Sequence, residues 1–150
     1  MPVALSLFLV LFFLLMNAFF VAAEFSLVRV RKSQVEILVD EDRSGAKYTK
    51  LVADNVNAYL SACQLGITLA SLALGWLGEP AVSQLIEGPL LAIGLPEAAI
   101  HGIAIAIGFV VITALHIVVG ELIPKSLAIF STERYALFSA TPLLWFYRIT

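Results

Sequence analysis

Residues 3–28 read VALSLFLVLFFLLMNAFFVAAEFSLV, and this stretch decides the fold. Its polar members are Ser6, Asn17, Glu24 and Ser26. About 20 apolar residues are enough for a helix to cross the hydrocarbon core of a bilayer. The stretch therefore predicts a transmembrane helix, which ends where Arg29 begins a basic segment.

A cleaved signal peptide is the alternative for this stretch, because Val21-Ala22-Ala23 loosely resembles a signal peptidase site. However, no basic residue precedes Arg29, and the apolar run is longer than the core of a signal peptide. We therefore expect a retained helix.

The whole chain of 150 residues shares this apolar character, with 61% hydrophobic and 13% charged residues. Soluble domains average about 25% charged residues, so the composition predicts a single membrane-embedded domain. A sequence pI near 5.6 offers no basic surface for nucleic acid. The single cysteine, Cys63, excludes an internal disulfide.

Two further apolar segments, residues 59–77 and 98–119, are each long enough to span a bilayer. Between them, a helical period predicts a short separate helix over residues 81–93. Residues 33–54 are hydrophilic, and we expect them to form two short helices with a turn at Ser44-Gly45.

The segment from Thr132 onwards is rich in aromatic residues, which favour the headgroup level of a membrane. We expect an amphipathic helix that lies in the inner interface, and a fourth crossing is the alternative. Because Thr150 stands inside this apolar helix, we expect the chain to be a fragment of a longer protein.

The predicted fold is an all-α membrane protein. It has three transmembrane helices, a juxtamembrane amphipathic helix, and a short cytoplasmic helical hairpin between the first and second spans. Six of the nine Lys and Arg residues lie within residues 29–50, and none lies within residues 52–123. Since basic residues stay on the cytoplasmic side, we expect the N-terminus and residues 78–97 outside, and the hairpin and the chain after Lys125 inside.

Polar residues inside the spans are the candidates for function, because they must face protein or water. Asn17 and Glu24 are seven residues apart and share one face of the first helix. Glu24 is close to Arg29, so an ion pair or an interfacial position is the alternative to a functional role.

The second span carries a polar stripe at helical spacing, formed by Ser61, Gln64, Thr68 and Ser71. Such a stripe can supply oxygen ligands. Stripes of small and polar residues also pack helices together in membranes, and the sequence leaves both interpretations open.

The third span ends in the sharpest signal, Gly120-Glu121 followed by Pro124. A proline ring displaces the carbonyl four residues earlier from its helical hydrogen bond, and that carbonyl belongs to Gly120. This oxygen and the Glu121 carboxylate suit a hard cation such as Mg²⁺ or Ca²⁺, and transporters use broken helices to coordinate ions. The alternative is a helix end at the membrane surface with Glu121 in solvent.

Oxygen-bearing groups from all three spans are therefore expected to gather in one cavity that opens to the inside. Soft metals are disfavoured, because the sequence offers no set of sulfur or paired imidazole ligands. His116 has no second ligand at metal-binding spacing, so we expect it to pack or to form a hydrogen bond. No nucleophile–base pair is readable, and we expect no enzyme.

Four motifs resemble the transmembrane domain of the CorC/CNNM (cyclin M-like) family, whose bacterial members are often called hemolysin-like or HlyC/CorC proteins. The motifs are NAFFVAAEFS at residues 17–26, ACQLGITLAS at residues 62–71, GWLGEP at residues 75–80 and GELIPKS at residues 120–126. The resemblance covers nearly the whole chain.

The resemblance implies a homodimer in the bacterial inner membrane that transports divalent cations, mainly by Mg²⁺ efflux with Na⁺ as the coupling ion. It also implies a pair of nucleotide-binding CBS domains and a small C-terminal domain beyond these 150 residues. Residues 21–23 depart from the Ser-Gly-Ser of many members. The asparagines of CNNM-type members fall near Ile67 and Ser71.

The expected function is therefore Mg²⁺ transport or export. The expected ligands, in chain order, are Glu24, Gln64, Thr68, Ser71, Gly120 and Glu121. Glu121 and the Gly120 carbonyl would bind the cation most directly, and Glu24 would lie near the cytoplasmic mouth. Pro124 and Gly66 match the family pattern and are expected to be structural. The alternative is a membrane anchor or ion sensor that transports nothing and tethers cytoplasmic domains.

Overall fold

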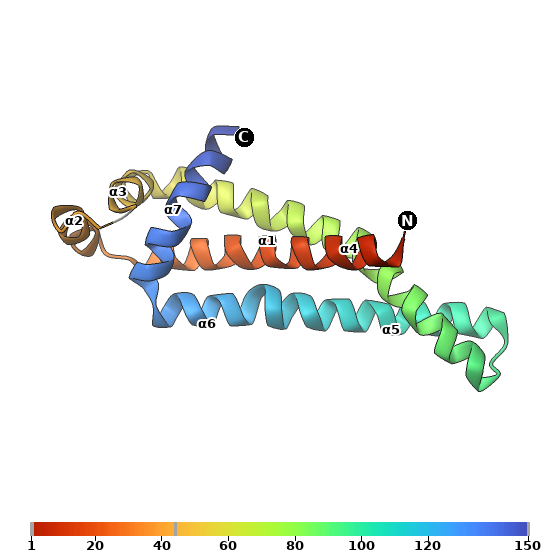
Figure 1. Cartoon of the computed structure of the whole chain (residues 1–150). Helices are drawn as coiled ribbons and strands as arrows, with labels where there is room; N and C mark the ends of the chain where they lie inside the picture. The colour runs from red at the N-terminus through yellow and green to blue at the C-terminus, as the bar shows by residue number, and fades with distance from the viewer. Residues whose placement is uncertain (1, 44, 150) are drawn as a thin grey trace.

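The computed structural model describes residues 2–43 and 45–149, without the side chains of Lys32 and Glu133. Three long helical rods lie side by side, and shorter helices gather at one end of them (Figure 1). The elements in chain order are α1 (Val3–Arg29), α2 (Lys32–Asp40), α3 (Ala46–Asp54), α4 (Val56–Ile93), α5 (Glu97–Ile117), the π-helical turn η1 (Val118–Leu122), α6 (Ile123–Phe130) and α7 (Thr132–Ile149).

Three stretches are long and apolar enough to cross a membrane, namely α1, α4 and the continuous rod over Glu97–Phe130 that comprises α5, η1 and α6. Along the bundle, α1 packs against α4 and, in its second half, against η1 and α6, whereas α4 meets α5 at the opposite end. The predicted all-α membrane fold is confirmed.

The two ends of the bundle differ in charge. The basic end carries α2, α3, α7 and the adjoining ends of α1 and α6, and the nine Lys and Arg residues of the chain belong to these elements or to their connections. The acidic end comprises the C-terminal part of α4, which carries Glu79 and Glu87, and the start of α5 at Glu97. Figure 1 shows the two ends on opposite sides of the view.

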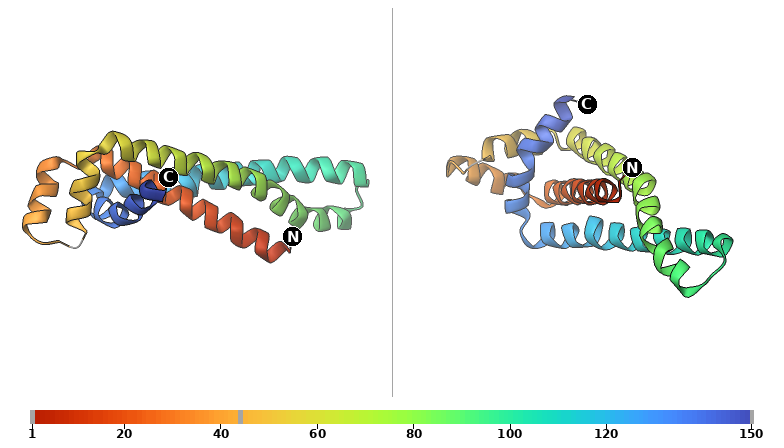
Figure 2. Two further views of the ribbon diagram at one scale, coloured as in Figure 1. Left: turned by 90° about the horizontal axis from the view of Figure 1, so that it is seen from above. Right: turned by 45° about the vertical axis from the view of Figure 1, so that its right-hand side comes forward.

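Helix α7 lies across the basic end of the bundle and not alongside the spans, as the views in Figures 1 and 2 agree. Its buried Ala140, Leu143 and Leu144 join one hydrophobic cluster with Phe20 of α1 and Tyr59 of α4. Burial of this apolar face holds the helix against the spans. The predicted helix beside the spans is therefore found, and α7 is not among the three candidate spans of the described residues.

The predicted hairpin is present as α2 and α3. Gly45 adopts φ +81°, a left-handed conformation that glycine accepts without steric cost. A Cβ on Gly45 would lie 3.2 Å from the Leu137 carbonyl oxygen. The Thr49 hydroxyl lies 3.0 Å from the Gly45 carbonyl oxygen and 3.4 Å from the Ala136 carbonyl oxygen, and either can accept its proton. The hairpin is thus tied to α7. Ser44, the other residue of the predicted turn, lies outside the described residues.

Two sequence predictions about helix ends are wrong. Helix α4 continues through Pro80 and Pro89 to Ile93, so residues 81–93 are not a separate helix. Likewise, Pro124 stands at the start of α6, and the rod continues past it through η1. A proline removes one N–H donor and bends a helix, but neighbouring groups can satisfy the freed carbonyl. Figure 1 shows α4 changing direction towards its C-terminal end.

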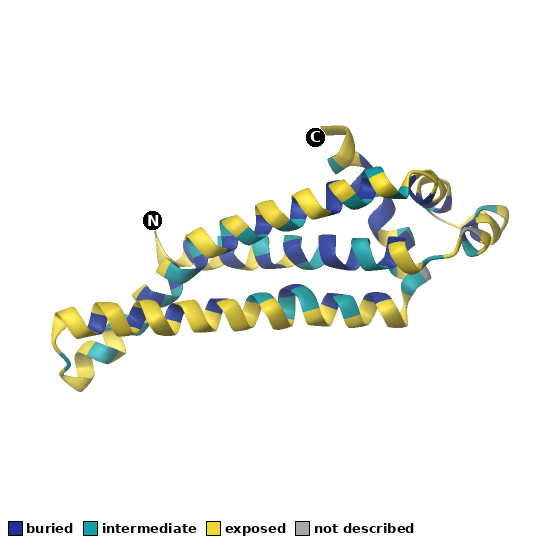
Figure 3. Cartoon of the chain, turned by 180° about the vertical axis from the view of Figure 1, so that it is seen from behind, coloured by how far each residue is buried: buried dark blue, intermediate teal, exposed yellow. Residues whose placement is uncertain are grey.

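Glycines allow the spans to approach closely. A Cβ on Gly66 of α4 would lie 2.5 Å from Cε2 of Phe20 on α1, and one on Gly78 would lie 2.8 Å from Cδ1 of Ile112 on α5. Small residues at such contacts let membrane helices gain van der Waals packing. Figure 3 shows buried residues facing between the rods and exposed residues facing outwards.

Gly66→Ala is expected to lower the stability of the bundle by about 1–3 kcal/mol, the usual cost of overpacking a filled core. The measurement is thermal unfolding in detergent micelles. Gly75→Ala is the matched control, because a Cβ there meets nothing within 4 Å and alanine favours a helix by up to about 1 kcal/mol. Equal melting temperatures for the two variants would show that Gly66 is not a packing position.

Candidate functional site

Asn17 lies near the middle of α1, and its side chain is fully buried. Its Nδ2 donates a hydrogen bond of 2.9 Å to the Gly120 carbonyl oxygen. Because the ring of Pro124 displaces that carbonyl from the helical ladder, the oxygen needs a donor from another element. The Asn17 amide supplies it across the interface between α1 and η1.

The turn η1 spans Val118–Leu122 and includes Gly120 and Glu121. The Ile123 N–H donates to the Val118 carbonyl, five residues earlier, as in a π-helix. Single π turns inside α-helices are frequent at functional sites. A π turn is wider than an α-helical turn, and this wider turn lets the helical rod continue past Pro124.

The hydrogen bonds continue from Asn17 to a third span. The Ser71 hydroxyl of α4 donates to Asn17 Oδ1 over 3.2 Å, and Ser71 Oγ lies 3.1 Å from His116 Nε2 of α5. A hydroxyl has one proton to give. When Ser71 gives it to Asn17, only a His116 that carries a proton on Nε2 can complete the contact, by donating to Ser71.

Glu121 stands at the edge of this chain of hydrogen bonds. Its Oε1 lies 3.9 Å from His116 Nε2, and its side chain is 44% exposed. The two groups form an ion pair only when His116 is protonated. Glu121 therefore provides a carboxylate that reaches both the buried network and the outside of the bundle.

Gly120 has no room for a side chain. A Cβ there would lie 2.9 Å from Asn17 Nδ2 and 3.1 Å from His116 Cδ2. Any larger residue would push the Asn17 amide away from the carbonyl, so the close approach of α1 to η1 requires glycine.

The structure brings some of the predicted site residues together and separates others. Ser71, Gly120 and Glu121 lie in one network, whereas Gln64 and Thr68 are exposed on α4. Glu24 is half-buried, two helical turns from Asn17, and forms no ion pair with any described basic residue. Of the residues expected to be structural, Pro124 is buried and Gly66 packs against Phe20.

Sequence reasoning did not include Asn17 or His116 in the ligand set, although the structure places both at the centre of the network. The signal for Asn17 was its position, since a lone amide in the middle of an apolar span must find a polar partner. Nothing in the sequence identified that partner as Gly120, 103 positions away.

Amide, hydroxyl and carbonyl oxygens from three spans, with one carboxylate beside them, form a donor set for a hard cation. Among the residues that the structure describes, no three His, Cys, Asp or Glu side chains converge. Binding here would therefore depend on neutral oxygens and on Glu121.

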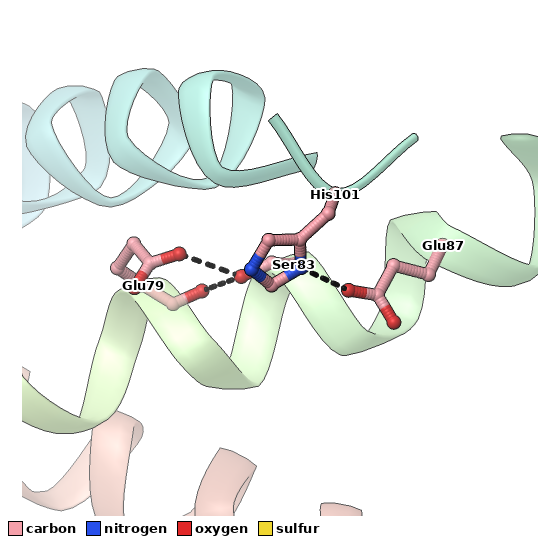
Figure 4. A network of polar contacts seen from close by, with 4 residues as sticks. All are labelled: Glu79, Ser83, Glu87 and His101. Carbon is pink, nitrogen blue, oxygen red and sulfur yellow. Dashed lines mark hydrogen bonds and ion pairs between the residues drawn. The ribbon is translucent and has the colours of Figure 1, made fainter. Parts of the chain in front are cut away.

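A second polar network lies at the acidic end (Figure 4). Ser83 Oγ lies 2.6 Å from the Glu79 carbonyl oxygen and 2.7 Å from Glu79 Oε1, both of which can accept its proton, and His101 Nδ1 lies 3.4 Å from Glu87 Oε1. The His101 side chain is 73% exposed, and exposed pairs contribute little to stability. This network joins α4 to α5 at the surface, so the buried network around Asn17 is the stronger candidate site.

Asn17→Leu is expected to lower the free energy of unfolding by about 1–2 kcal/mol, because it removes two interhelical hydrogen bonds and leaves the Gly120 oxygen unpaired. Thermal unfolding in micelles measures the loss. Asn57→Leu, at an exposed position of α4, is the control. Ser71→Ala should lower the free energy of unfolding less in the Asn17→Leu background than in the parent. If the losses of the two single variants simply add in the double variant, the residues are not coupled.

Comparison with known proteins agrees with this architecture. The family model of the cyclin M transmembrane N-terminal domain matches residues 8–150. The chain is 46% identical over 144 residues to UPF0053 protein YrkA of Bacillus subtilis, covering 94% of this chain and 33% of that protein. It is 42% identical over 134 residues to UPF0053 protein YugS of the same organism, covering 89% and 31%.

A mycobacterial relative extends the comparison. The chain is 36% identical over 133 residues to the uncharacterized protein Rv1841c of Mycobacterium tuberculosis, covering 89% of this chain and 37% of that protein. The chain thus spans about a third of the length of these relatives. A model match over almost the entire sequence, on a bundle of three apolar rods, shows that this chain belongs to the cyclin M transmembrane domain family.

Proposed function

We propose that this chain is the membrane domain of a divalent-cation transporter that exports Mg²⁺, with Na⁺ as the coupling ion. The observation that supports this proposal is the chain of polar contacts linking Gly120, Asn17, Ser71 and His116 within the bundle. Polar and ionisable groups at membrane depth are costly and mark ion pathways by default.

In the proposed mechanism the hydrogen bonds are exchanged for bonds to the cation. Asn17 Oδ1, Ser71 Oγ and the Gly120 carbonyl each carry a lone pair, and Glu121 adds a negative charge. Mg²⁺ prefers six oxygen ligands and keeps several of its waters, so a partial protein shell is sufficient. A site that is satisfied without the ion binds it weakly enough to release it, as conduction requires.

The proposed orientation places the basic end in the cytoplasm, because basic residues stay on that side. The exposed Gln64 and Thr68 on α4 would face hydrocarbon in a single chain. Burying such groups against protein is favourable in a membrane. We therefore propose a homodimer in the bacterial inner membrane, with a second copy covering this polar stripe.

A non-transporting membrane anchor is the second candidate. One observation favours it: among the described residues, every buried side-chain nitrogen and oxygen already has a hydrogen-bond partner. Packing of the spans alone could account for a network whose hydrogen bonds are already complete. We propose no enzymatic activity in either case.

Mg²⁺ is expected to stabilise the parent protein by about 1.4 kcal/mol at ten times its dissociation constant. Glu121→Gln keeps the shape of the side chain and removes its charge, so it should lose most of this gain. The measurement is the melting temperature with and without Mg²⁺. Glu97→Gln at the acidic end is the control and should respond like the parent. Equal stabilisation of Glu121→Gln and parent would exclude Glu121 as a ligand.

Measuring Mg²⁺ flux distinguishes a transporter from a membrane anchor. Proteoliposomes that contain the full-length protein and an internal Mg²⁺-sensitive dye should show Mg²⁺ movement that increases with an opposing Na⁺ gradient. Ser71→Ala should reduce the rate, because it removes one oxygen ligand. An anchor predicts no flux under any gradient, and that result would overturn the proposed function.

A further inference from the structure

A large open pocket lies at the basic end, between the α2–α3 hairpin and the corner where α6 meets α7. Its volume is about 1000 Å³. Arg43 and Tyr48 line it from the hairpin, and Phe130, Thr132 and Arg134 line it from the corner. The contact between Gly45 and the Leu137 carbonyl fixes the two walls relative to each other.

The chemistry of this pocket suits a phosphate group. The lining side chains that the structure describes include two arginines but neither Asp nor Glu. Within the described part of the chain, neither Arg43 nor Arg134 has a carboxylate within 4 Å. A guanidinium binds phosphate through paired N–H donors, and the hydroxyls of Ser131 and Tyr48 are further donors in the same lining.

An apolar groove of about 400 Å³ adjoins the pocket on the side of the spans. Leu15, Ala18 and Phe19 of α1 form one wall of the groove, and Ile123 and Leu127 of α6 form the other. Phe138 of α7 lines both the groove and the basic pocket, so this ring lies between the two spaces. A ligand that fills both needs a phosphate joined to a hydrocarbon chain.

The position of the pocket matches the membrane surface. It lies where α6 ends at Phe130 and where α7 crosses the bundle (Figure 1). Phe130 is 87% exposed and Phe138 is 67% exposed, and apolar side chains on an interfacial helix insert at the boundary between headgroups and acyl chains. Basic pockets beside membrane helices are known to bind anionic headgroups.

We propose that this pocket and groove together bind one anionic phospholipid, with its phosphate between Arg43 and Arg134 and one acyl chain along the groove between α1 and α6. A free phosphate compound would use only the basic pocket. A second copy of the chain would use only the groove. The lipid is favoured because the basic pocket and the apolar groove lie on either side of one shared side chain, Phe138.

The test measures lipid retained by the purified full-length protein in native mass spectrometry, after exchange into nanodiscs with phosphatidylglycerol and phosphatidylcholine at equal amounts. The parent should retain phosphatidylglycerol preferentially. Arg43→Gln combined with Arg134→Gln should reduce this preference about tenfold, the effect expected from losing charge-assisted hydrogen bonds. Arg31→Gln combined with Lys50→Gln removes two charges from exposed positions outside the pocket and should leave the preference unchanged.

The proposal is overturned if the Arg43→Gln/Arg134→Gln variant prefers phosphatidylglycerol as strongly as the parent does. It is also overturned if the Arg31→Gln/Lys50→Gln control loses as much of this preference as the pocket variant. A soluble competitor provides the last outcome. Glycerol phosphate is added at about 10 mM, a concentration on the order of that at which a weak ligand binds. Complete displacement of the lipid would assign the pocket to a soluble phosphate compound and would also overturn the proposal.

A second pair of variants tests the groove. Ala18→Phe fills it and should also lower phosphatidylglycerol retention, whereas Ala106→Phe, at an exposed position of α5, should not. If Ala18→Phe instead converts dimers to monomers with lipid retention unchanged, the groove belongs to an interface between copies, and the lipid proposal fails. Circular dichroism melting confirms that each variant is folded before it is compared.

Discussion

The hydrogen bond from the Asn17 amide to the Gly120 carbonyl is the contact on which the arrangement of the spans depends. Pro124 takes that carbonyl out of the helical ladder, and a membrane interior offers no water to replace the lost donor. The amide therefore has to come from another span at the same depth. This requirement brings α1 against η1, makes glycine necessary at position 120, and orients Asn17 Oδ1 towards Ser71. One proline thus organises polar groups from three helices.

Close helix packing is the condition for that contact. Hydrophobic burial gives little driving force between helices in lipid, because lipid tails are as apolar as the side chains. Glycines at positions 66 and 78 let ring and aliphatic side chains of neighbouring spans come within contact distance. The cluster of Phe20, Tyr59 and Leu143 then joins α7 to the two spans it crosses. The outward faces of the rods remain apolar and exposed, as a membrane requires (Figure 3).

The proposed ion site and the proposed lipid site lie against the same segment of the third rod. Val119 within the π turn and Pro124 just after it line the apolar groove, while Gly120 between them is buried against Asn17. The π turn departs from the α-helical hydrogen-bond ladder of the rest of the rod. An occupant of the groove would therefore contact the one part of the rod whose register is not held by ordinary helical bonds. The basic end of the molecule is in this way physically connected to its buried polar centre.

The sequence by itself determined the three apolar spans, the charge difference between the two ends and the Gly120–Pro124 signal, because hydropathy, charge and proline geometry act locally along the chain. It placed helix ends at Pro80 and Pro124 wrongly, since whether a proline stops a helix depends on what surrounds the freed carbonyl. It also could not tell that Ser71 faces Asn17 while Gln64 and Thr68 face outwards. Only the tertiary structure decided these points, because the partners are up to 103 positions apart and meet through the packing of glycines against neighbouring side chains.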